Sequence, residues 1–399
     1  MLTRNYIQES ILKKGFSKNN SKNYQKIFFS IKDNLENSNQ TLNILSKNFK
    51  LNFKITDLRK FQKFNNIVII GMGGSILGTE AIYGFLKKKI KKNIYFLDDI
   101  DWEKILDLKK IKFSKTLFII ISKSGNTIET LSNALFLKVL KKNSKNIIII
   151  TERNNNYLHF LSKKLNLFLI EHKTNIGGRY SVLSEVGLVP AYLMGINVIK
   201  LRSQCLSFLK RKNNQFLKES ALKLSNLINT KKINNLVFLN YSPRLEKFLY
   251  WCQQLIGESL GKKNKGFFPV VSNMPKDHHS LLQLYLDGPK DKIFHIFSAE
   301  EKIEKKFNTG KMFQKKTFLN NQNLQKIKKA QKNALIKSLK KNKIPFREFI
   351  IKNLNEETLG RLFSYFILET IMVGKLINVN PFDQPAVEQV KTFTKKLLS

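Results

Sequence analysis

The chain has 399 residues, 42% of them hydrophobic, which is enough to build two packed domains. Its formal net charge is +42, but the excess is nearly all lysine spread along the chain, so we expect a compositional bias and no specific nucleic-acid partner. The two cysteines, Cys205 and Cys252, lack the spacing of a zinc site or a disulfide framework, and we expect neither a metal nor a cofactor.

Residues 1–60 are polar and lysine-rich, and we expect them to form a helical segment at the periphery. They contain no apolar run of signal-peptide length. The longest apolar runs elsewhere are far too short to span a bilayer. We therefore expect a cytoplasmic protein without a membrane partner.

From residue 67 the pattern changes to short β-branched runs that alternate with amphipathic stretches. The expected strands lie at 67–71, 94–97, 116–122 and 147–151. A helical stretch follows each of them, which is typical of a parallel sheet with helices on both faces.

A second series of the same kind begins near residue 234, after an expected connecting helix at about 201–230. Strands are expected at 235–241, 268–271 and 293–297, and long helices from residue 356, broken at 378–381. The pattern predicts an α/β fold of two tandem doubly wound parallel-sheet domains with peripheral helices. We place the N-terminal segment at 1–60, the domains at 61–200 and 201–375, and a helical C-terminal tail at 376–399.

Residues 71–78, which contain four glycines and Ser75, follow a predicted strand and open a helix. Glycine lets the backbone approach a ligand closely, and the free N–H groups of a helix start favour an anion. The third glycine of a dinucleotide fingerprint is replaced by Ile76, and no nucleotide-triphosphate loop is present. The segment predicts a small-anion site, with a tight structural turn as the alternative.

A second loop, residues 122–127, follows another apolar strand and also precedes a helix. Its hydroxyl residues Ser122, Ser124 and Thr127 supply the short donors that a phosphate monoester needs. In the alternative interpretation, Thr127 or Asn126 only caps the helix. Two such loops at adjacent strand ends indicate a phosphosugar cleft at the carboxyl edge of a sheet.

Both loops resemble those of the sugar-isomerase (SIS) fold. Four further segments are similar to the glucose-6-phosphate isomerase family, namely 177–181, 253–259, 279–284 and 380–391. The resemblance covers roughly residues 65–395 in the family's order, in a chain that is short for the family. It implies two SIS-type domains and an aldose–ketose isomerase of glycolysis and gluconeogenesis. Such an enzyme interconverts glucose 6-phosphate and fructose 6-phosphate by ring opening and proton transfer through a cis-enediol.

The resemblance also implies roles for individual residues. The residues expected to hold the substrate phosphate are Ser75, Ser122, Lys123, Ser124 and Thr127, and Gly178 and Gln254 are expected to contact substrate. The expected catalytic residues are Glu258 as the base, Arg179 as the cation that stabilises the enediolate, and His279 and Lys391 for ring opening, the last from the C-terminal tail. A carboxylate base, a permanently charged donor and a histidine near neutral pH suit this chemistry. No step requires a metal.

Each catalytic assignment has an alternative. In the alternative interpretation, Glu258 is a solvated carboxylate on a helix, and Arg179 only caps the turn after the glycine doublet that precedes it. His279 follows His278, either of which fits a surface histidine, and we favour His279 because the residues after it keep the family's register. Lys391 lies among other lysines, where a solvated side chain is the usual expectation.

The family forms an active site completed by a neighbouring subunit, with the matching histidine donated across the interface, so the resemblance implies a homodimer. Three other functions stay open. One is another SIS-type phosphosugar isomerase, including one that also accepts mannose 6-phosphate. Another is a non-catalytic sugar-phosphate-binding regulator, which would not need Glu258, Arg179 and Lys391 together. A polyanion-binding role rests on charge alone.

Overall fold

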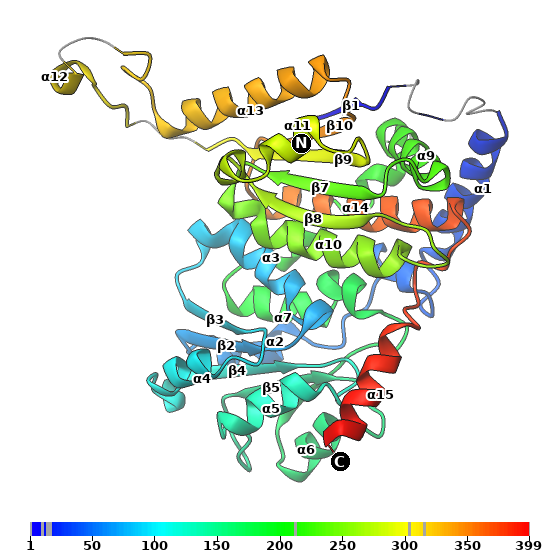
Figure 1. The fold of residues 1–399 in the computed structure, drawn as a ribbon. Coiled ribbons are helices and arrows are strands. Elements are labelled where there is room, and N and C mark those ends of the chain that lie inside the picture. The colour runs from blue at the N-terminus through cyan, green and yellow to red at the C-terminus, as the bar shows by residue number, and fades with distance from the viewer. Residues whose placement is uncertain are drawn as a thin grey trace.

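The computed structural model describes residues 2–8, 12, 18–210, 214–301, 305–313 and 317–398. The chain forms two five-stranded sheets, which Figure 1 shows one above the other with helices packed between them. The strand order is β3-β2-β4-β5-β6 in the first sheet and β8-β7-β9-β10-β1 in the second. Because the chain visits both sheets in nearly the same order, the two halves share one doubly wound plan. The predicted α/β fold is confirmed, while the domain boundaries stay a prediction.

All neighbouring strands of the first sheet run parallel. The strands are β2 (Asn66–Ile70), β3 (Asn93–Leu97), β4 (Thr116–Ile121), β5 (Ile147–Thr151) and β6 (Phe168–Glu171). Strands β4 and β5 are buried along their whole length, as parallel strands covered by helices on both faces must be. The four strands expected here are present; β6, a short run, was not identified from the sequence.

The second sheet is parallel except at one edge. Its parallel strands are β7 (Asn235–Asn240), β8 (Phe268–Asn273), β9 (Lys292–Ala299) and β10 (Phe346–Ile351). The prediction of helix throughout residues 1–60 is wrong at β1 (Leu2–Tyr6), which pairs antiparallel with β10. This short polar strand has no apolar alternation of its own and depends on its partner for its hydrogen bonds. Strand β10 was also not identified from the sequence.

Helices cover both faces of each sheet and form the layer between them. Those in the first half of the chain are α1 (Lys18–Asn34), α2 (Ile55–Leu58), α3 (Leu77–Leu86), α4 (Trp102–Lys109), α5 (Ile128–Phe136), α6 (Tyr157–Lys164), α7 (Glu185–Leu193) and α8 (Val198–Arg202). Those in the second half are α9 (Asn214–Thr230), α10 (Glu246–Leu260), α11 (Leu282–Asp287), α12 (Gly310–Phe313), α13 (Leu324–Lys341), α14 (Glu356–Leu376) and α15 (Val387–Leu398).

Helix α10 connects the two halves of the molecule. It follows β7 of the second sheet but packs against α3, which follows β2 of the first sheet, and against α14. Its side chains Phe248, Leu249 and Trp251 are fully buried in the main core. Burying a large apolar side chain contributes about 1.5–3 kcal/mol. This packing holds residues of the second half over the edge of the first sheet.

The C-terminal helix α15 leaves the body of the protein after residue 386 and runs beside the first sheet (Figure 1). None of its described residues is buried. Among the residues that the structure describes, no helix has the length and apolar character needed to cross a membrane. Cys205 and Cys252 are both buried and unbridged.

Candidate functional site

Two loops meet at the carboxyl edge of the first sheet. The chain goes from β2 to β3 on one side and then to β4 on the other, so the loops that follow β2 and β4 start from neighbouring strands. They approach closely, since a Cβ atom on Gly71 would stand 3.1 Å from the carbonyl oxygen of Ile121. Ligands of open α/β sheets bind at such a change of direction. The sequence-based prediction that the two loops lie side by side is confirmed.

The loop after β2 packs directly on two other parts of the site. A Cβ atom on Gly74 would stand 2.2 Å from the carbonyl carbon of Gly178, so the two backbones touch. Gly73 has a positive φ of 50°, and a Cβ atom there would stand 2.9 Å from Nε2 of Gln254. These glycines therefore bring Gly178 and Gln254 against the loop that carries Ser75, which is half-buried.

The three hydroxyl residues of the loop after β4 differ in exposure: Ser122 is buried, Thr127 is half-buried and Ser124 is exposed. Oγ of Ser122, which is buried, lies 2.8 Å from Oγ1 of Thr127 and accepts a hydrogen bond from the Gly125 N–H at 3.1 Å. Ser124 is exposed, and its Oγ accepts from the Asn126 N–H at 3.3 Å. Thr127 makes no capping hydrogen bond to α5, so capping does not explain it. Only the Ser124 hydroxyl is fully open to an incoming phosphate.

Lys123, from the same loop, is half-buried and anchored. Its Nζ donates to the carbonyl oxygen of Thr174 at 2.8 Å and lies 3.6 Å from Oε1 of Glu152. Burial lowers the pKa of Lys123, the Glu152 carboxylate opposes this, and the charge of Arg179 adds to the lowering. His172 is buried nearby with no hydrogen-bond partner for either ring nitrogen. Burial and the Lys123 charge lower the His172 pKa to about 3, so the ring is neutral near pH 7.

Arg179 lies on the 3-10 helix η7 (Gly178–Leu183), and its side chain is completely buried. Its five N–H groups all have acceptors. They are Oγ of Ser259 at 2.8 Å, Oε2 of Glu258 at 3.2 Å, the carbonyl oxygens of Pro381 at 2.6 Å and Asp383 at 3.0 Å, and the side chain of Gln384. The guanidinium thus joins η7, α10 and residues 381–384. A role limited to capping the turn does not account for this arrangement.

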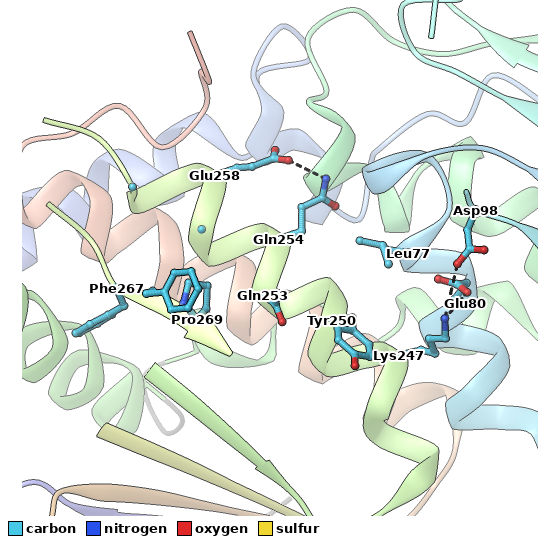
Figure 2. A pocket seen from close by; sticks show the side chains of 13 residues that line it. Leu77, Glu80, Asp98, Lys247, Tyr250, Gln253, Gln254, Glu258, Phe267 and Pro269 are labelled. Carbon is cyan, nitrogen blue, oxygen red and sulfur yellow. Dashed lines mark hydrogen bonds and ion pairs between the residues drawn. The ribbon is translucent and has the colours of Figure 1, made fainter. Parts of the chain in front are cut away.

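Glu258 and Gln254 lie one turn apart on α10, and Figure 2 shows their side chains directed toward each other. Nε2 of Gln254 donates to Oε1 of Glu258 at 2.9 Å, while Arg179 binds the other carboxylate oxygen. The Glu258 side chain is still 30% exposed. It is therefore oriented by two donors and accessible, unlike a freely solvated helix carboxylate. Oε1 of Gln254 is buried without a partner.

No role is predicted from the sequence for Gln384, Ser259 or Lys262. Lys262 lies 3.0 Å from Oδ1 of Asp383 and so helps to hold the chain segment that covers Arg179. Gln384 and Asp383 belong to one of the segments that carry the family resemblance, which was the available signal for them. Ser259 belongs to another of these segments, 253–259, whereas no local pattern identifies Lys262.

A cavity of about 730 Å³ adjoins the site along α10. Glu258 and Gln254 line one end of it, and Lys247 lines the other, paired at 2.7 Å with Glu80 of α3 (Figure 2). Burial raises the pKa of the Glu80 carboxyl group, and Lys247 opposes this shift. Leu77, at the start of α3, lines it, but Ser75 and the hydroxyl residues of the loop after β4 do not. The cavity therefore borders the expected sugar position without containing the expected phosphate position.

Two predicted catalytic residues lie apart from this group. His279 is exposed on η11 (Lys276–His279), which follows β8 in the second sheet. Lys391 is exposed on α15, where it pairs with Glu388 at 2.7 Å. Within the described residues, no hydrogen bond or ion pair joins either of them to Glu258 or Arg179. The structure thus brings together Gly178, Arg179, Gln254 and Glu258 beside the two loops, and the roles of His279 and Lys391 stay predictions.

Comparison with known proteins agrees with this geometry. A family model described as phosphoglucose isomerase matches residues 34–399. The glucose-6-phosphate isomerase of Methanocaldococcus jannaschii is 35% identical over 86% of this chain and 87% of its own length. The glucose-6-phosphate isomerase of Carboxydothermus hydrogenoformans is 32% identical over 84% of this chain and 79% of its own length.

Solved structures show the same fold. A hypothetical protein of Thermus thermophilus superposes with a TM-score of 0.81 and 26% identity over the whole of both chains. A glucose-6-phosphate isomerase of Chlamydia trachomatis has a TM-score of 0.72 and 21% identity, covering 86% of this chain and 71% of that one.

Proposed function

This chain belongs to the phosphoglucose isomerase family, and we propose that it is an aldose–ketose isomerase that interconverts glucose 6-phosphate and fructose 6-phosphate. The observation that carries this proposal is the Glu258 carboxylate, held between Arg179 and Gln254 beside two loops suited to a phosphate. The reaction belongs to glycolysis and gluconeogenesis, and we place it in the cytoplasm.

The phosphate of the substrate binds at the loops after β2 and β4. Ser124 offers an exposed hydroxyl, and the Ser122–Thr127 pair retains one hydroxyl hydrogen that is not used between them. The hydroxyl group of Ser75 and the ammonium group of Lys123 complete the set of donors. Fixing the phosphate there places the other end of the sugar toward Gly178 and α10, since Gly74 touches Gly178.

Glu258 moves the proton between the two carbons. In the open-chain aldose, its carboxylate takes the proton from C2, and the electron pair of that bond forms the C1–C2 double bond of an enediolate. Return of the same proton to C1, with transfer of the O2 proton to O1, leaves the carbonyl on C2. A general base positioned in this way contributes about 10²- to 10⁴-fold to the rate.

Arg179 stabilises the negative charge that develops on oxygen. Its guanidinium is buried, so its charge acts in a medium of low dielectric constant and is always present. All five of its N–H groups already have acceptors. A direct hydrogen bond to the enediolate therefore requires Arg179 to give up one of its present hydrogen bonds, such as the one to Gln384.

Ring opening requires proton transfer to the ring oxygen, and we assign it to His279 with Lys391. The exposure of His279, far along the chain from the loops, supports its donation to the site of a partner subunit in a homodimer. Sizing of the protein in solution tests this arrangement, and a monomer with full activity would contradict it.

The test of the function is a coupled assay that follows conversion of fructose 6-phosphate to glucose 6-phosphate. We expect turnover by the native chain and a loss of at least 100-fold for Glu258→Gln, with binding of the phosphate ester retained. Glu219→Gln, which changes a partly exposed carboxylate on α9, is the matched control and should be fully active. Absence of turnover by the folded native protein would reject the proposal.

Offering mannose 6-phosphate in the same assay distinguishes the broader phosphosugar isomerase. A non-catalytic regulator would bind the hexose phosphates without converting them. The pairing of Glu258 with both Arg179 and Gln254 favours catalysis, because a phosphate sensor has no use for an oriented base.

A further inference from the structure

We infer that Tyr241 and Asp277 are positioning residues for His279, and that Tyr241 holds the neighbouring His278 out of the reaction. The inference rests on the proposed function, because it concerns the group that opens the sugar ring. It addresses which of two adjacent histidines is available for proton transfer. The two rings lie on the same short element, η11, but have different surroundings.

His278 has a fixed partner, whereas His279 has none. The phenol oxygen of Tyr241 lies 2.8 Å from Nε2 of His278, and the two rings meet edge to face with centroids 5.9 Å apart. Tyr241 is the residue that follows β7, is 3% exposed and belongs to the core between the second sheet and α13. His278 is half-buried, while His279 is exposed with no hydrogen bond or ion pair among the described residues.

The chemistry of the pair keeps His278 neutral. Burial and the nearby ring of His279 lower the pKa of His278, and burial raises the pKa of Tyr241. A neutral imidazole and a neutral phenol can exchange a hydrogen bond in either direction. A charged His278 would disfavour a proton on His279 next to it. Fixing His278 in the neutral form therefore leaves the acid–base role to His279.

Asp277 fixes the backbone on both sides of His279. Its Oδ2 accepts hydrogen bonds from Oγ of Ser272 and from the Asn273 N–H, both at 2.8 Å, which attaches the turn to the end of β8. Its carbonyl oxygen accepts from the Leu281 N–H at 2.9 Å, just before α11. His279 is thus held between two anchored points, and only its side chain projects into solvent.

Asn273 extends this anchorage to α10. Its Nδ2 donates to Oε1 of Glu246 at 2.7 Å, and its Oδ1 accepts from Nδ2 of Asn240 at 2.9 Å. The ends of β7 and β8 and the first turn of α10 are therefore one hydrogen-bonded unit. Misplacing a catalytic group by about 1 Å can cost 100-fold in rate, so this support has a measurable kinetic role.

The experiment is a double-mutant cycle between Tyr241→Phe and His279→Ala, measured by kcat and KM in the coupled assay. Tyr241→Phe removes only the hydroxyl group, and we expect kcat to fall about 10- to 100-fold with little change in KM. In the His279→Ala background, Tyr241→Phe should cause no further loss, because its effect acts through His279. Asp277→Ala, which removes the side-chain acceptor of Ser272 and Asn273, should behave in the same way.

Two further variants separate positioning from general stability. His278→Gln keeps a side chain that can hydrogen bond to Tyr241 and should retain most of the activity, whereas His278→Ala should lose as much as Tyr241→Phe. The inference would be overturned if the kcat losses of Tyr241→Phe and His279→Ala multiplied in the double variant. It would also be overturned if the loss of activity were explained by a lowered melting temperature alone. Activity that depends on His278 and survives His279→Ala would also overturn it. No turnover by the native chain would instead reject the proposed function, and this inference with it.

Discussion

Nη1 of Arg179 lies 3.2 Å from Oε2 of Glu258, and this contact joins residues that are 79 positions apart in the chain. Arg179 lies at the edge of the first sheet, whereas Glu258 lies on a helix that follows a strand of the second sheet. The contact exists because α10 packs against α3. The candidate catalytic pair is therefore a product of the packing between the two halves.

Replacing Arg179 by lysine should impair both activity and stability. Lysine keeps the charge but has three N–H groups instead of five, so acceptors such as the Asp383 carbonyl oxygen lose the hydrogen bond that Arg179 donates. We expect kcat to fall at least 100-fold, and the free energy of unfolding to fall by about 1–3 kcal/mol. Steady-state kinetics and urea unfolding measure the two effects. Arg153→Lys, at an exposed ion pair with Glu171, is the control and should change neither quantity.

Gly74→Ala should disrupt the site through its backbone. The added methyl group would stand 2.2 Å from the carbonyl carbon of Gly178, and neither backbone segment can move without separating the loop from η7. We expect a loss of about 3 kcal/mol or more in the free energy of unfolding, or loss of activity in protein that still folds. Gly84→Ala on α3 is the matched control, because its nearest neighbour would be 3.7 Å away. That change should be neutral or slightly stabilising.

The buried neutral His172 should make the protein less stable in acid. Its pKa is about 3 in the folded protein against 6.5 for an ordinary histidine, so between these values the unfolded chain binds the extra proton. The effect of His172 on the free energy of unfolding is therefore constant above pH 6.5. As the pH falls from 6.5 toward 3, the free energy of unfolding decreases by at most about 1.4 kcal/mol per pH unit.

Urea unfolding of the native chain and of His172→Gln between pH 4.5 and 7.5 tests this dependence. The variant should show a smaller loss of stability with acid than the native chain. His159→Gln, at a half-buried histidine that hydrogen bonds to the Asn154 carbonyl oxygen, is the matched control for replacing a histidine by glutamine. Equal slopes for the native chain and His172→Gln would contradict the prediction.

The strands that could be predicted are those with a strong local signal. Strands β4 and β5 are buried on both faces and must be apolar at nearly every position, so a run of isoleucine marks them. Strand β1 is polar and lies at an edge, and it forms only because β10, near the other end of the chain, offers free hydrogen-bonding groups. The residues around β1 in the sequence give no sign that β10 will pair with it.

The same distinction applies to the site. The glycines and hydroxyl residues of the two loops were found from the sequence because a close backbone approach and a phosphate both restrict residue type locally. No role was predicted for Ser259, although it ends the segment 253–259, or for Lys262, because a serine and a lysine on or after a helix have many other uses. The contact between Tyr241 and His278 was likewise not predicted, because Tyr241 follows β7 and lies 37 positions away in the chain.

The sequence by itself determined the alternation of strands and helices, the two loops at the first sheet's edge and the family to which the chain is similar. These properties depend on neighbouring residues or on segments kept in order. Only the tertiary structure decided which residues meet: the side chain of Arg179 with those of Glu258 and Gln384, the backbones of Gly74 and Gly178, and the side chains of Tyr241 and His278. The physical reason is that such contacts depend on how whole helices and sheets pack, and packing sums many weak interactions from distant parts of the chain.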